Sequence, residues 1–340
     1  MQTVIDKIAQ NITGTHDQAS STFSLDEVPN LQGKVAVVTG GSEGIGYGCT
    51  HTLLTHGISK LFITSRRDEK AEEALSAIEQ EFGPEARNKV VYIQNDQSDW
   101  AQTAKVASEI ASQTDRLDIL INNAARGIMT YQLAPTNGTD LHFAVNHAGH
   151  VIMVSHLLPL LKKTAEKDTV RIVNLSSNLH ESAPSDTKFD SVEDLNQDLG
   201  PNAQYSRAKL MNLLHARYMN RHLHSAHPKI LYNATHPGIV DTAQTNEHIH
   251  EAYPLLGYGM SAAMKPFKKS QFEGCVSTMF AATTITGSGL YVCPPCQVEK
   301  GSDLSNNEQL QESLMKLTRE IVEEKTRSGS SEKGCPFKDY

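Results

Sequence analysis

The sequence has few of the features that mark membrane, secreted or nucleic-acid-binding proteins. It has 340 residues, and no apolar run approaches the ~20 residues of a membrane helix. The formal net charge is -8, which disfavours a nucleic-acid surface as the main function. The N-terminus lacks both the basic-then-apolar order of a secretory signal and the Arg-rich character of a mitochondrial presequence. We therefore expect a cytoplasmic protein with no membrane span and no nucleic-acid partner.

Cysteine is scarce, and the odd number of scattered positions is not typical of a disulfide framework. Cys293-Pro-Pro-Cys296 has the spacing of a redox motif; a structural role is favoured, and a redox or metal role stays open. Three of the 15 histidines, His142, His147 and His150, fall in one helical region. No set of three or four ligands has zinc-site spacing, so we expect no metal.

Apolar, β-branched runs alternate along the chain with segments of helical periodicity. The runs predict strands at 34–39, 60–64, 90–94, 117–121, 170–175, 230–235 and 290–292. Helices are predicted up to residue 56 and at 68–82, 100–113, 137–165, 203–222, 272–282 and 308–324, with a kink at Pro159. This alternation is typical of an α/β fold: a Rossmann-type, doubly wound, parallel seven-stranded sheet with helices on both faces.

Composition divides the chain into three parts. Residues 1–30 are polar and predict an N-terminal extension outside the core. Residues 31–325 predict a single dinucleotide-binding domain, and residues 326–340 a flexible tail. Residues 240–270 carry aromatic and apolar side chains in a long irregular segment. They predict either core packing or a mobile lid over an apolar substrate.

A glycine-rich loop, Thr39-Gly-Gly-Ser-Glu-Gly-Ile-Gly46, joins the first strand to the first helix. Glycines allow a tight turn and a close approach of the backbone to a ligand, and a helix N-terminus offers free N–H groups to a pyrophosphate. We therefore predict a dinucleotide site here, with a purely structural turn as the alternative. The predicted contacts are Gly40, Ser42, Glu43, Gly44, Ile45 and Gly46.

The end of the second strand bears on the choice between NAD(H) and NADP(H). Ser65-Arg66-Arg67 stands where an acidic residue would bind the 2′-hydroxyl of NAD, and a hydroxyl with two guanidinium groups suits a 2′-phosphate. Asp68 just beyond is a weaker counter-argument, and Arg67 could instead be a solvated surface charge. We prefer NADP(H). Further contacts are predicted at the ends of the next two strands, from Asp96, Gln97, Asn123 and Ala124.

Tyr205 and Lys209 are one helical turn apart, on the same face of a predicted helix. A tyrosine has an unperturbed pKa of ~10, which a neighbouring ammonium lowers, so the pair forms a plausible acid–base. The spacing alone is weak. Ser176 and Ser177 end the fifth strand and Pro237-Gly238 follows the sixth, so these elements meet at one sheet edge. That convergence predicts an active site.

With these motifs in place, residues 33–325 resemble the short-chain dehydrogenase/reductase family. The matching positions are Thr39–Gly46, Asp96, Asn122–Ala125, Asn146, Ser177, Tyr205 with Lys209, and Pro237-Gly238. The resemblance implies that Tyr205 is the proton donor or base and that Ser177 hydrogen-bonds the substrate oxygen. It implies that Lys209 lowers the Tyr205 pKa and holds the nicotinamide ribose, while Asn146 holds a water that links Lys209 to solvent. Pro237, Gly238, Val240 and Thr242 would bind the nicotinamide carboxamide.

Two departures qualify the resemblance. Ala125 replaces the family's usual glycine, which adds one methyl group. The long segment between Ser177 and Tyr205 looks like the retinol-dehydrogenase-like branch, whose members act on lipophilic aldehydes and ketones. Within it, His180 is a candidate substrate contact, weighed against a plain loop residue.

The sequence therefore predicts an NADP(H)-dependent oxidoreductase that interconverts a lipophilic carbonyl and an alcohol, on a sheet of strand order 3-2-1-4-5-6-7. Reduction is the expected direction, because cytosolic NADP pools are usually reduced. Two alternatives are a non-catalytic NADP(H)-binding sensor or scaffold, and a relative that catalyses epimerisation or dehydration. The partners implied are a small carbonyl or alcohol substrate and further copies of the chain, as a homodimer or homotetramer.

Overall fold

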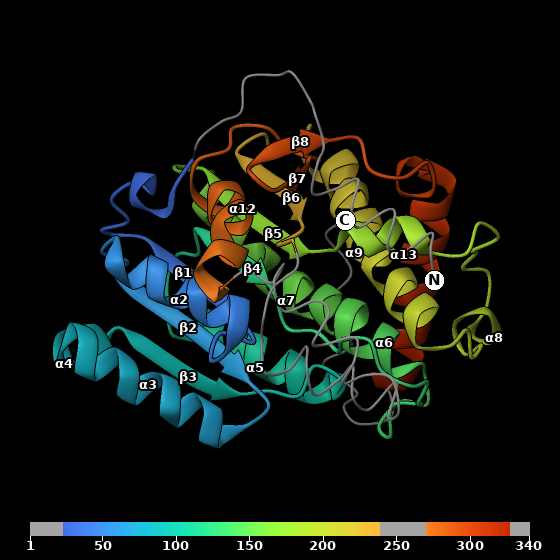
Figure 1. The fold of residues 1–340 in the computed structure, drawn as a ribbon, viewed down its shortest axis with the longest axis horizontal. Helices are drawn as coiled ribbons and strands as arrows, with labels where there is room; N and C mark the ends of the chain where they lie inside the picture. The colour runs from blue at the N-terminus through green and yellow to red at the C-terminus, as the bar shows by residue number, and fades with distance from the viewer. Residues whose placement is uncertain (1–22, 239–269, 327–340) are drawn as a thin grey trace.

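Within the residues that the computed structural model describes, 23–238 and 270–326, eight strands form one sheet in the order β3-β2-β1-β4-β5-β6-β7-β8 (Figure 1). The strands are β1 Val35–Thr39, β2 Lys60–Ser65, β3 Val90–Gln94, β4 Ile119–Asn122, β5 Val170–Leu175, β6 Ile230–Thr235, β7 Tyr291–Cys293 and β8 Gln297–Glu299. All neighbours pair in parallel except β7 and β8. The α/β architecture is confirmed, and β8 is a correction to the predicted count of seven.

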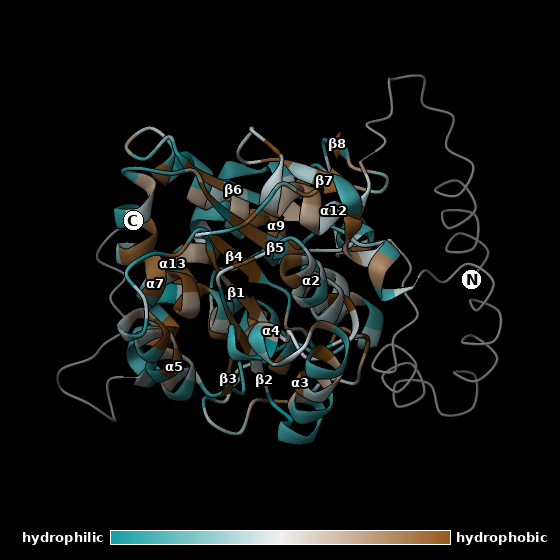
Figure 2. Ribbon diagram, turned by 90° about the vertical axis from the view of Figure 1, so that its left-hand side faces the viewer, coloured by the Kyte–Doolittle hydropathy of each residue, from teal (hydrophilic) through white to brown (hydrophobic). Residues whose placement is uncertain are grey.

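Helices cover both faces of the sheet, which explains why the central strands are apolar along their whole length. One face packs against α2 Gly44–Thr55, α3 Asp68–Phe82 and α12 Gln271–Thr283. The other packs against α5 Trp100–Ser112, α7 Gly149–Ala165 and α9 Pro201–Leu223, with α13 Glu308–Thr326 against α9. Figure 2 shows hydrophobic strands at the centre, between helices with largely hydrophilic outer surfaces.

The short elements differ most from expectation. A short helix that was not predicted, α4 Pro84–Asn88, follows α3 directly after Gly83. The helix predicted from residue 137 begins at α6 Leu141–Phe143, because Asp140 accepts hydrogen bonds from the backbone N–H groups of His142 and Phe143. A π-helical turn, Ala144–Ala148, then joins α6 to α7. α7 runs through Pro159 without ending there, and the kink predicted at Pro159 stays a prediction.

Other short helical segments lie outside the predicted pattern: η1 Leu25–Glu27, η3 Asn178–Ser182, α8 Val192–Leu195 and η5 Leu304–Asn306. Residues 23–30 are not wholly outside the core, since Val28 is buried and the Phe23 ring packs 5.1 Å from that of Phe280. Residues 239–269 are outside the described residues. Val240, Thr242 and the candidate lid, 240–270, therefore lie outside them too, except for Ser270 at the end of the lid.

In the part of the chain that the structure describes, one helical stretch has the length and hydropathy of a membrane span, Leu141–Ala165. It is the continuous run from α6 to α7, and 83% of its most apolar window is buried inside the protein. Its hydrophobicity is therefore accounted for by packing between the sheet and the neighbouring helices.

Candidate active site

A cavity of about 790 Å³ opens at the carboxyl ends of β1 to β6. This is the edge where ligands bind in doubly wound sheets. Sixteen of the predicted site residues line it: Gly40, Glu43, Gly44, Ile45, Ser65, Arg66, Arg67, Asp96, Gln97, Asn123, Ala124, Ser177, Tyr205, Lys209, Pro237 and Gly238. The chain thus brings together, at one edge, motifs that lie almost 200 residues apart in the sequence, as their positions 40 and 238 show.

The glycine loop passes so close to β4 that side chains cannot be added to it. A Cβ on Gly46 would lie 2.0 Å from the Gly40 carbonyl oxygen and 2.5 Å from Asn123 Nδ2. Gly40 and Gly44 have φ values of +63° and +55°, a conformation that favours glycine. The bare backbone at the start of α2 therefore fits a dinucleotide pyrophosphate. Nearby, Ser42 is buried and its Oγ has no hydrogen-bond partner among the described residues.

The charged groups after β2 are already engaged with one another. Arg67 Nη2 lies 2.8 Å from both carboxylate oxygens of Glu43 in the glycine loop. Asp68 accepts hydrogen bonds from Tyr92 at 2.5 Å and from Gln94 at 3.0 Å. Arg66 is exposed at the rim of the cavity. Thus Asp68 is held by β3, Arg67 is neutralised by Glu43, and Arg66 is the more available cation.

The residues after β3 and β4 mainly order the loops. Asp96 Oδ1 accepts hydrogen bonds from the backbone and hydroxyl of Ser98 at 2.8 and 2.7 Å. The side-chain amide of Gln97 is buried, and its Nε2 has no partner in the described chain. Asn123 Nδ2 donates to the carbonyl oxygens of Thr39 and Gly40, at 2.9 and 3.1 Å. Asn123 therefore ties β4 to the glycine loop.

Tyr205 and Lys209 project from α9 into the cavity. Lys209 Nζ donates to the Leu175 carbonyl oxygen at 3.0 Å and lies 5.6 Å from the centre of the Tyr205 ring. Burial lowers the pKa of Lys209 to about 8. Burial raises the pKa of Tyr205 to about 12, and a hydrogen bond with Ser177 works against that rise. Lys209 is not among the causes of this shift, so the lowering of the Tyr205 pKa by its ammonium stays a prediction.

The two serines after β5 have different partners. Ser176 Oγ donates to the Lys209 carbonyl oxygen at 2.7 Å, which fixes strand β5 to helix α9. Ser177 lines the cavity, and its Oγ accepts a hydrogen bond from the backbone of Leu179 at 3.2 Å. The alternation of side chains along an extended chain accounts for the difference. Ser177 is the serine that faces Tyr205.

Asn146 lies in the π-helical turn next to the cavity, not on its lining. Its side chain clamps the loop after β4: Oδ1 accepts from the Arg126 backbone N–H at 2.6 Å, and Nδ2 donates to the Arg126 carbonyl oxygen at 2.9 Å. The side-chain amide is thus used to position a neighbouring loop. The predicted role of Asn146 in holding a water stays a prediction.

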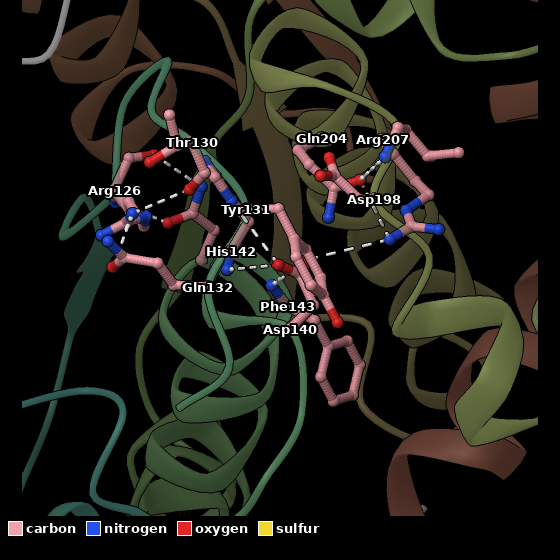
Figure 3. Close-up of polar contacts among 12 residues, drawn as sticks. Arg126, Thr130, Tyr131, Gln132, Asp140, His142, Phe143, Asp198, Gln204 and Arg207 are labelled. Atoms are coloured by element: carbon pink, nitrogen blue, oxygen red, sulfur yellow. Dashed lines mark hydrogen bonds and ion pairs between the residues drawn. The ribbon is translucent and has the colours of Figure 1, made fainter. Parts of the chain in front are cut away.

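Figure 3 shows the polar contacts of the segment that follows β4. Arg126 lines the cavity and donates from Nη2 to the Thr130 carbonyl oxygen and to Gln132 Oε1, both at 3.0 Å. At the end of the segment, the buried Asp140 caps α6 and lies 3.8 Å from Arg207 of α9. Sequence reasoning did not select Arg126, although its place after the Asn122–Ala125 motif could have indicated it.

His180, the candidate substrate contact, does not line the cavity, which favours the alternative of a loop residue. It is fully buried, with Nδ1 2.7 Å from the Ser177 carbonyl oxygen and Nε2 accepting from the Ser302 backbone at 3.1 Å. The 3-10 turn η3 directs the ring away from the cavity and under β7, where it packs 5.0 Å from Tyr291. His180 therefore anchors the loop after β5.

The predicted redox or metal candidates lie elsewhere. Cys293 ends β7 and Cys296 lies in the turn before β8; both are buried, and neither forms a disulfide. Over 23–238 and 270–326, no group of three histidine, cysteine or acidic side chains is arranged to hold a metal ion.

Comparison with known proteins agrees with this arrangement. Residues 34–186 match the family model described as short chain dehydrogenase. A Neurospora crassa protein, bli-4, provisionally named as a mitochondrial oxidoreductase, is 50% identical, covering 100% of this chain and 84% of the relative. A Danio rerio polyprenol dehydrogenase is 29% identical, covering 89% and 91%. The NADPH-bound carbonyl reductase from chicken fatty liver is 19% identical with a TM-score of 0.57, covering 79% and 99%.

The cytoplasmic location predicted from the sequence is contradicted by the Neurospora crassa relative, which is named as mitochondrial and matches the full length of this chain. Absence of an Arg-rich presequence was a weak guide to location. The argument for reduction over oxidation falls with it, because it depended on a cytosolic NADP pool. On the glycine cradle, the cavity and the full-length relative together, the chain belongs to the short-chain dehydrogenase/reductase family of nicotinamide-dependent oxidoreductases.

Proposed function

We propose that this protein interconverts a lipophilic ketone or aldehyde and the corresponding alcohol with NADP(H). The observation that carries the proposal is the meeting of Ser177, Tyr205 and Lys209 in one cavity whose other end is the glycine cradle. A reacting carbonyl between these groups would have a hydroxyl donor and a tuned acid within reach.

Each residue has a role that its surroundings support. The bound nicotinamide supplies the hydride that forms the new C–H bond, or accepts it in the reverse direction. In reduction, the Tyr205 hydroxyl gives its proton to the substrate oxygen, and in oxidation the phenolate takes that proton back. Ser177 Oγ donates a hydrogen bond to the same oxygen as negative charge develops on it. The Lys209 ammonium, held by the Leu175 carbonyl, stabilises the phenolate form of Tyr205.

The preference for NADP(H) rests on the arginines after β2. Arg66 at the cavity rim and Arg67 beside it give a 2′-phosphate two guanidinium partners. Asp68, the acidic residue that could favour NAD(H), has both carboxylate oxygens occupied by Tyr92 and Gln94. Glu43 opposes the preference, because a 2′-phosphate must compete with it for Arg67.

A lipophilic substrate is supported by the other wall of the cavity. Apolar side chains are part of the lining of the same cavity: Ile128, Met129, Leu141, Val145 and Leu179. Burial of apolar substrate surface against such a wall contributes affinity without specific polar contacts. The polyprenol dehydrogenase relative is consistent with this substrate class, as is the predicted retinol-dehydrogenase-like branch.

The test is binding followed by turnover. We expect purified protein to bind NADPH more tightly than NADH by fluorescence titration, and to oxidise NADPH with members of a panel of lipophilic ketones, aldehydes and quinones. Tyr205→Phe should lower kcat by about 10²–10⁴-fold and leave the NADPH Kd nearly unchanged, because it removes only the transferable proton. NADPH binding with no turnover of any panel member would favour the sensor alternative. Turnover without net NADPH consumption would favour epimerisation or dehydration.

A further inference from the structure

A buried histidine joins the cofactor loop to the π-helical turn. His150, the second residue of α7, is 2% exposed and contacts two polar groups. Its Nε2 lies 3.0 Å from Thr39 Oγ1 at the end of β1, and its Nδ1 lies 3.1 Å from the Asn146 carbonyl oxygen. Nothing in the proposed reaction uses this ring, although it lies directly behind the catalytic residues.

The hydrogen bonds of Thr39 determine which ring nitrogen of His150 carries the proton. Thr39 Oγ1 accepts from the backbone N–H groups of Asn123 and Ala124, at 2.9 and 3.0 Å, which uses both of its lone pairs. Its single proton must go to an acceptor, and His150 Nε2 at 3.0 Å is closer than the Ile121 carbonyl oxygen at 3.4 Å. Nε2 therefore accepts, and the proton of a neutral ring is on Nδ1, aimed at the Asn146 carbonyl.

The surroundings keep the ring neutral. Burial, together with the nearby Lys209 ammonium, lowers the pKa of His150 to about 4, although the hydrogen bond with the Asn146 backbone works against that fall. His147 and His215 are the other titratable groups close to the ring, and burial lowers their pKa values as well, to about 3 for His147. A second proton on His150 would also place Nε2–H against the Thr39 hydroxyl proton. The ring should therefore stay neutral throughout the physiological pH range.

These contacts form a closed circuit of hydrogen bonds beside the cavity. Thr39 bonds His150, His150 bonds the Asn146 carbonyl, and the Asn146 side chain clamps Arg126. From Arg126 the chain runs back through Ala125 to Ala124, whose N–H returns to Thr39. The circuit links the glycine-loop end of β1, the loop after β4 and the π-helical turn. Buried polar circuits of this kind make a site rigid, and each bond holds the two groups that it joins.

We propose that His150, as the neutral Nδ1–H tautomer, is a positioning residue that holds the cofactor loop and Asn146 in register with each other. It touches neither substrate nor cofactor and acts through Thr39 on one side and through Asn146 on the other. The kinetic consequences rest on the proposed NADP(H)-dependent function, and the tautomer does not.

Two substitutions separate the two halves of this role. In His150→Asn, the side-chain amide nitrogen falls near the place of Nδ1, so the bond to the Asn146 carbonyl is kept and that to Thr39 is lost. In His150→Gln, the amide reaches the place of Nε2, so an acceptor for Thr39 is kept and the bond to Asn146 is lost. We expect His150→Asn mainly to raise the NADPH Kd, and His150→Gln mainly to lower kcat, each by about tenfold, the size of one buried hydrogen bond.

The matched control is His156→Gln, which changes a histidine farther along the same helix that contacts Ser108 on α5. It should leave both NADPH Kd and kcat unchanged. Equal loss of NADPH affinity and kcat in His150→Asn and His150→Gln would show a merely structural ring and overturn the proposal. Wild-type values in both would overturn it as well.

A second measurement uses the wild-type protein, so it depends neither on the folding of a variant nor on enzyme activity. Protein labelled with ¹⁵N-histidine should show, by long-range ¹H–¹⁵N correlation between pH 6 and 8, a His150 ring with a protonated Nδ1 and an unprotonated Nε2. A protonated Nε2, alone or with Nδ1, would contradict the proposal whatever the enzyme does. Wild-type protein that shows this tautomer but does not turn over any carbonyl would instead contradict the proposed function and leave the positioning circuit standing.

Discussion

Lys209 is a cation in a place where burial opposes its charge. Its ammonium has a carbonyl partner at 3.0 Å, the Leu175 oxygen, and its pKa is lowered to about 8 from an ordinary 10.5. A site that must stabilise a phenolate benefits from a nearby charge that water does not screen. The same desolvation makes that charge easy to lose as the pH rises.

The lowered pKa of Lys209 predicts how activity and stability depend on pH. We expect the kcat/KM for carbonyl reduction to fall as the pH rises through about 8, because Lys209 then loses its proton. Stability should change in the opposite sense: between about pH 8 and 10.5 the unfolded chain binds more protons than the folded one, so this lysine raises the free energy of unfolding with pH. A pH series of initial rates and of urea midpoints measures both. A flat rate profile from pH 7 to 9 would show that the Lys209 charge is not required.

Glu43 offers a second prediction at the scale of single residues. Glu43→Gln frees Arg67 from a partner 2.8 Å away and removes a negative charge from the place where a 2′-phosphate would bind. Because the pair is partly exposed, we expect a modest gain, with the NADPH Kd falling about three- to tenfold and the NADH Kd unchanged. Fluorescence titration measures both. Glu73→Gln, which breaks the exposed ion pair with Lys70, is the control. An equal gain for NADH would mean that Glu43 does not act on the phosphate.

The catalytic and cofactor motifs could be read from the sequence because they fall at fixed offsets from strand ends. The Glu43–Arg67 pair could not, because its two members, 24 positions apart in the sequence, are brought together only by the pairing of β1 with β2. His180 was misjudged for a related reason. Its closeness to Ser177 in sequence suggested the cavity, but the turn η3 sends the ring toward Ser302, which is 122 residues away.

At the scale of elements, α2 packs against the sheet through positions that tolerate no side chain. Gly46→Ala would place a methyl carbon 2.0 Å from the Gly40 carbonyl oxygen, and neither backbone can move without disturbing β1 or β4. We expect a loss of about 1–3 kcal/mol in the free energy of unfolding and loss of dinucleotide binding. Thermal unfolding and NADPH titration measure the two effects.

Gly83→Ala, between α3 and α4, is the matched control for Gly46→Ala. Gly83 has a φ of +82° but nothing within 4 Å of an added Cβ, so its replacement should cost backbone strain alone and keep NADPH affinity. If Gly46→Ala bound NADPH as tightly as Gly83→Ala does, the close approach of the glycine loop would not be needed for the cofactor.

Long periodic elements were the easiest to predict, and short ones the hardest. Helix α3 and strands β5 and β6 begin and end at the predicted residues, since their apolar faces and flanking breakers leave one interpretation. Strand β8 has only three residues, of which one is apolar, so no period can be recognised. In the π-helical turn, the Asn146 side chain bonds the backbone of Arg126, 20 positions away, a contact that local patterns do not contain.

At the scale of the whole molecule, the order of strands accounts for the place of the site. Strand β1 lies between β2 and β4, so the chain reverses direction across the sheet there, and the loops that leave β1 and β4 diverge to open a cavity. This topology was expected because alternating strands and helices leave few other arrangements. Location in the cell was not, since it depends on recognition by other proteins and not on the fold.

Strand β8 also bears on how copies of this chain can assemble. By pairing with β7, it covers backbone N–H and C=O groups that would otherwise offer a template to another chain. It is short and ends in the acidic Glu299, features with which sheets discourage further strand addition. The sheet should therefore stop growing at this edge. In the predicted homodimer or homotetramer, we expect the subunits to meet through helical surfaces and not through a sheet continued from one subunit into the next.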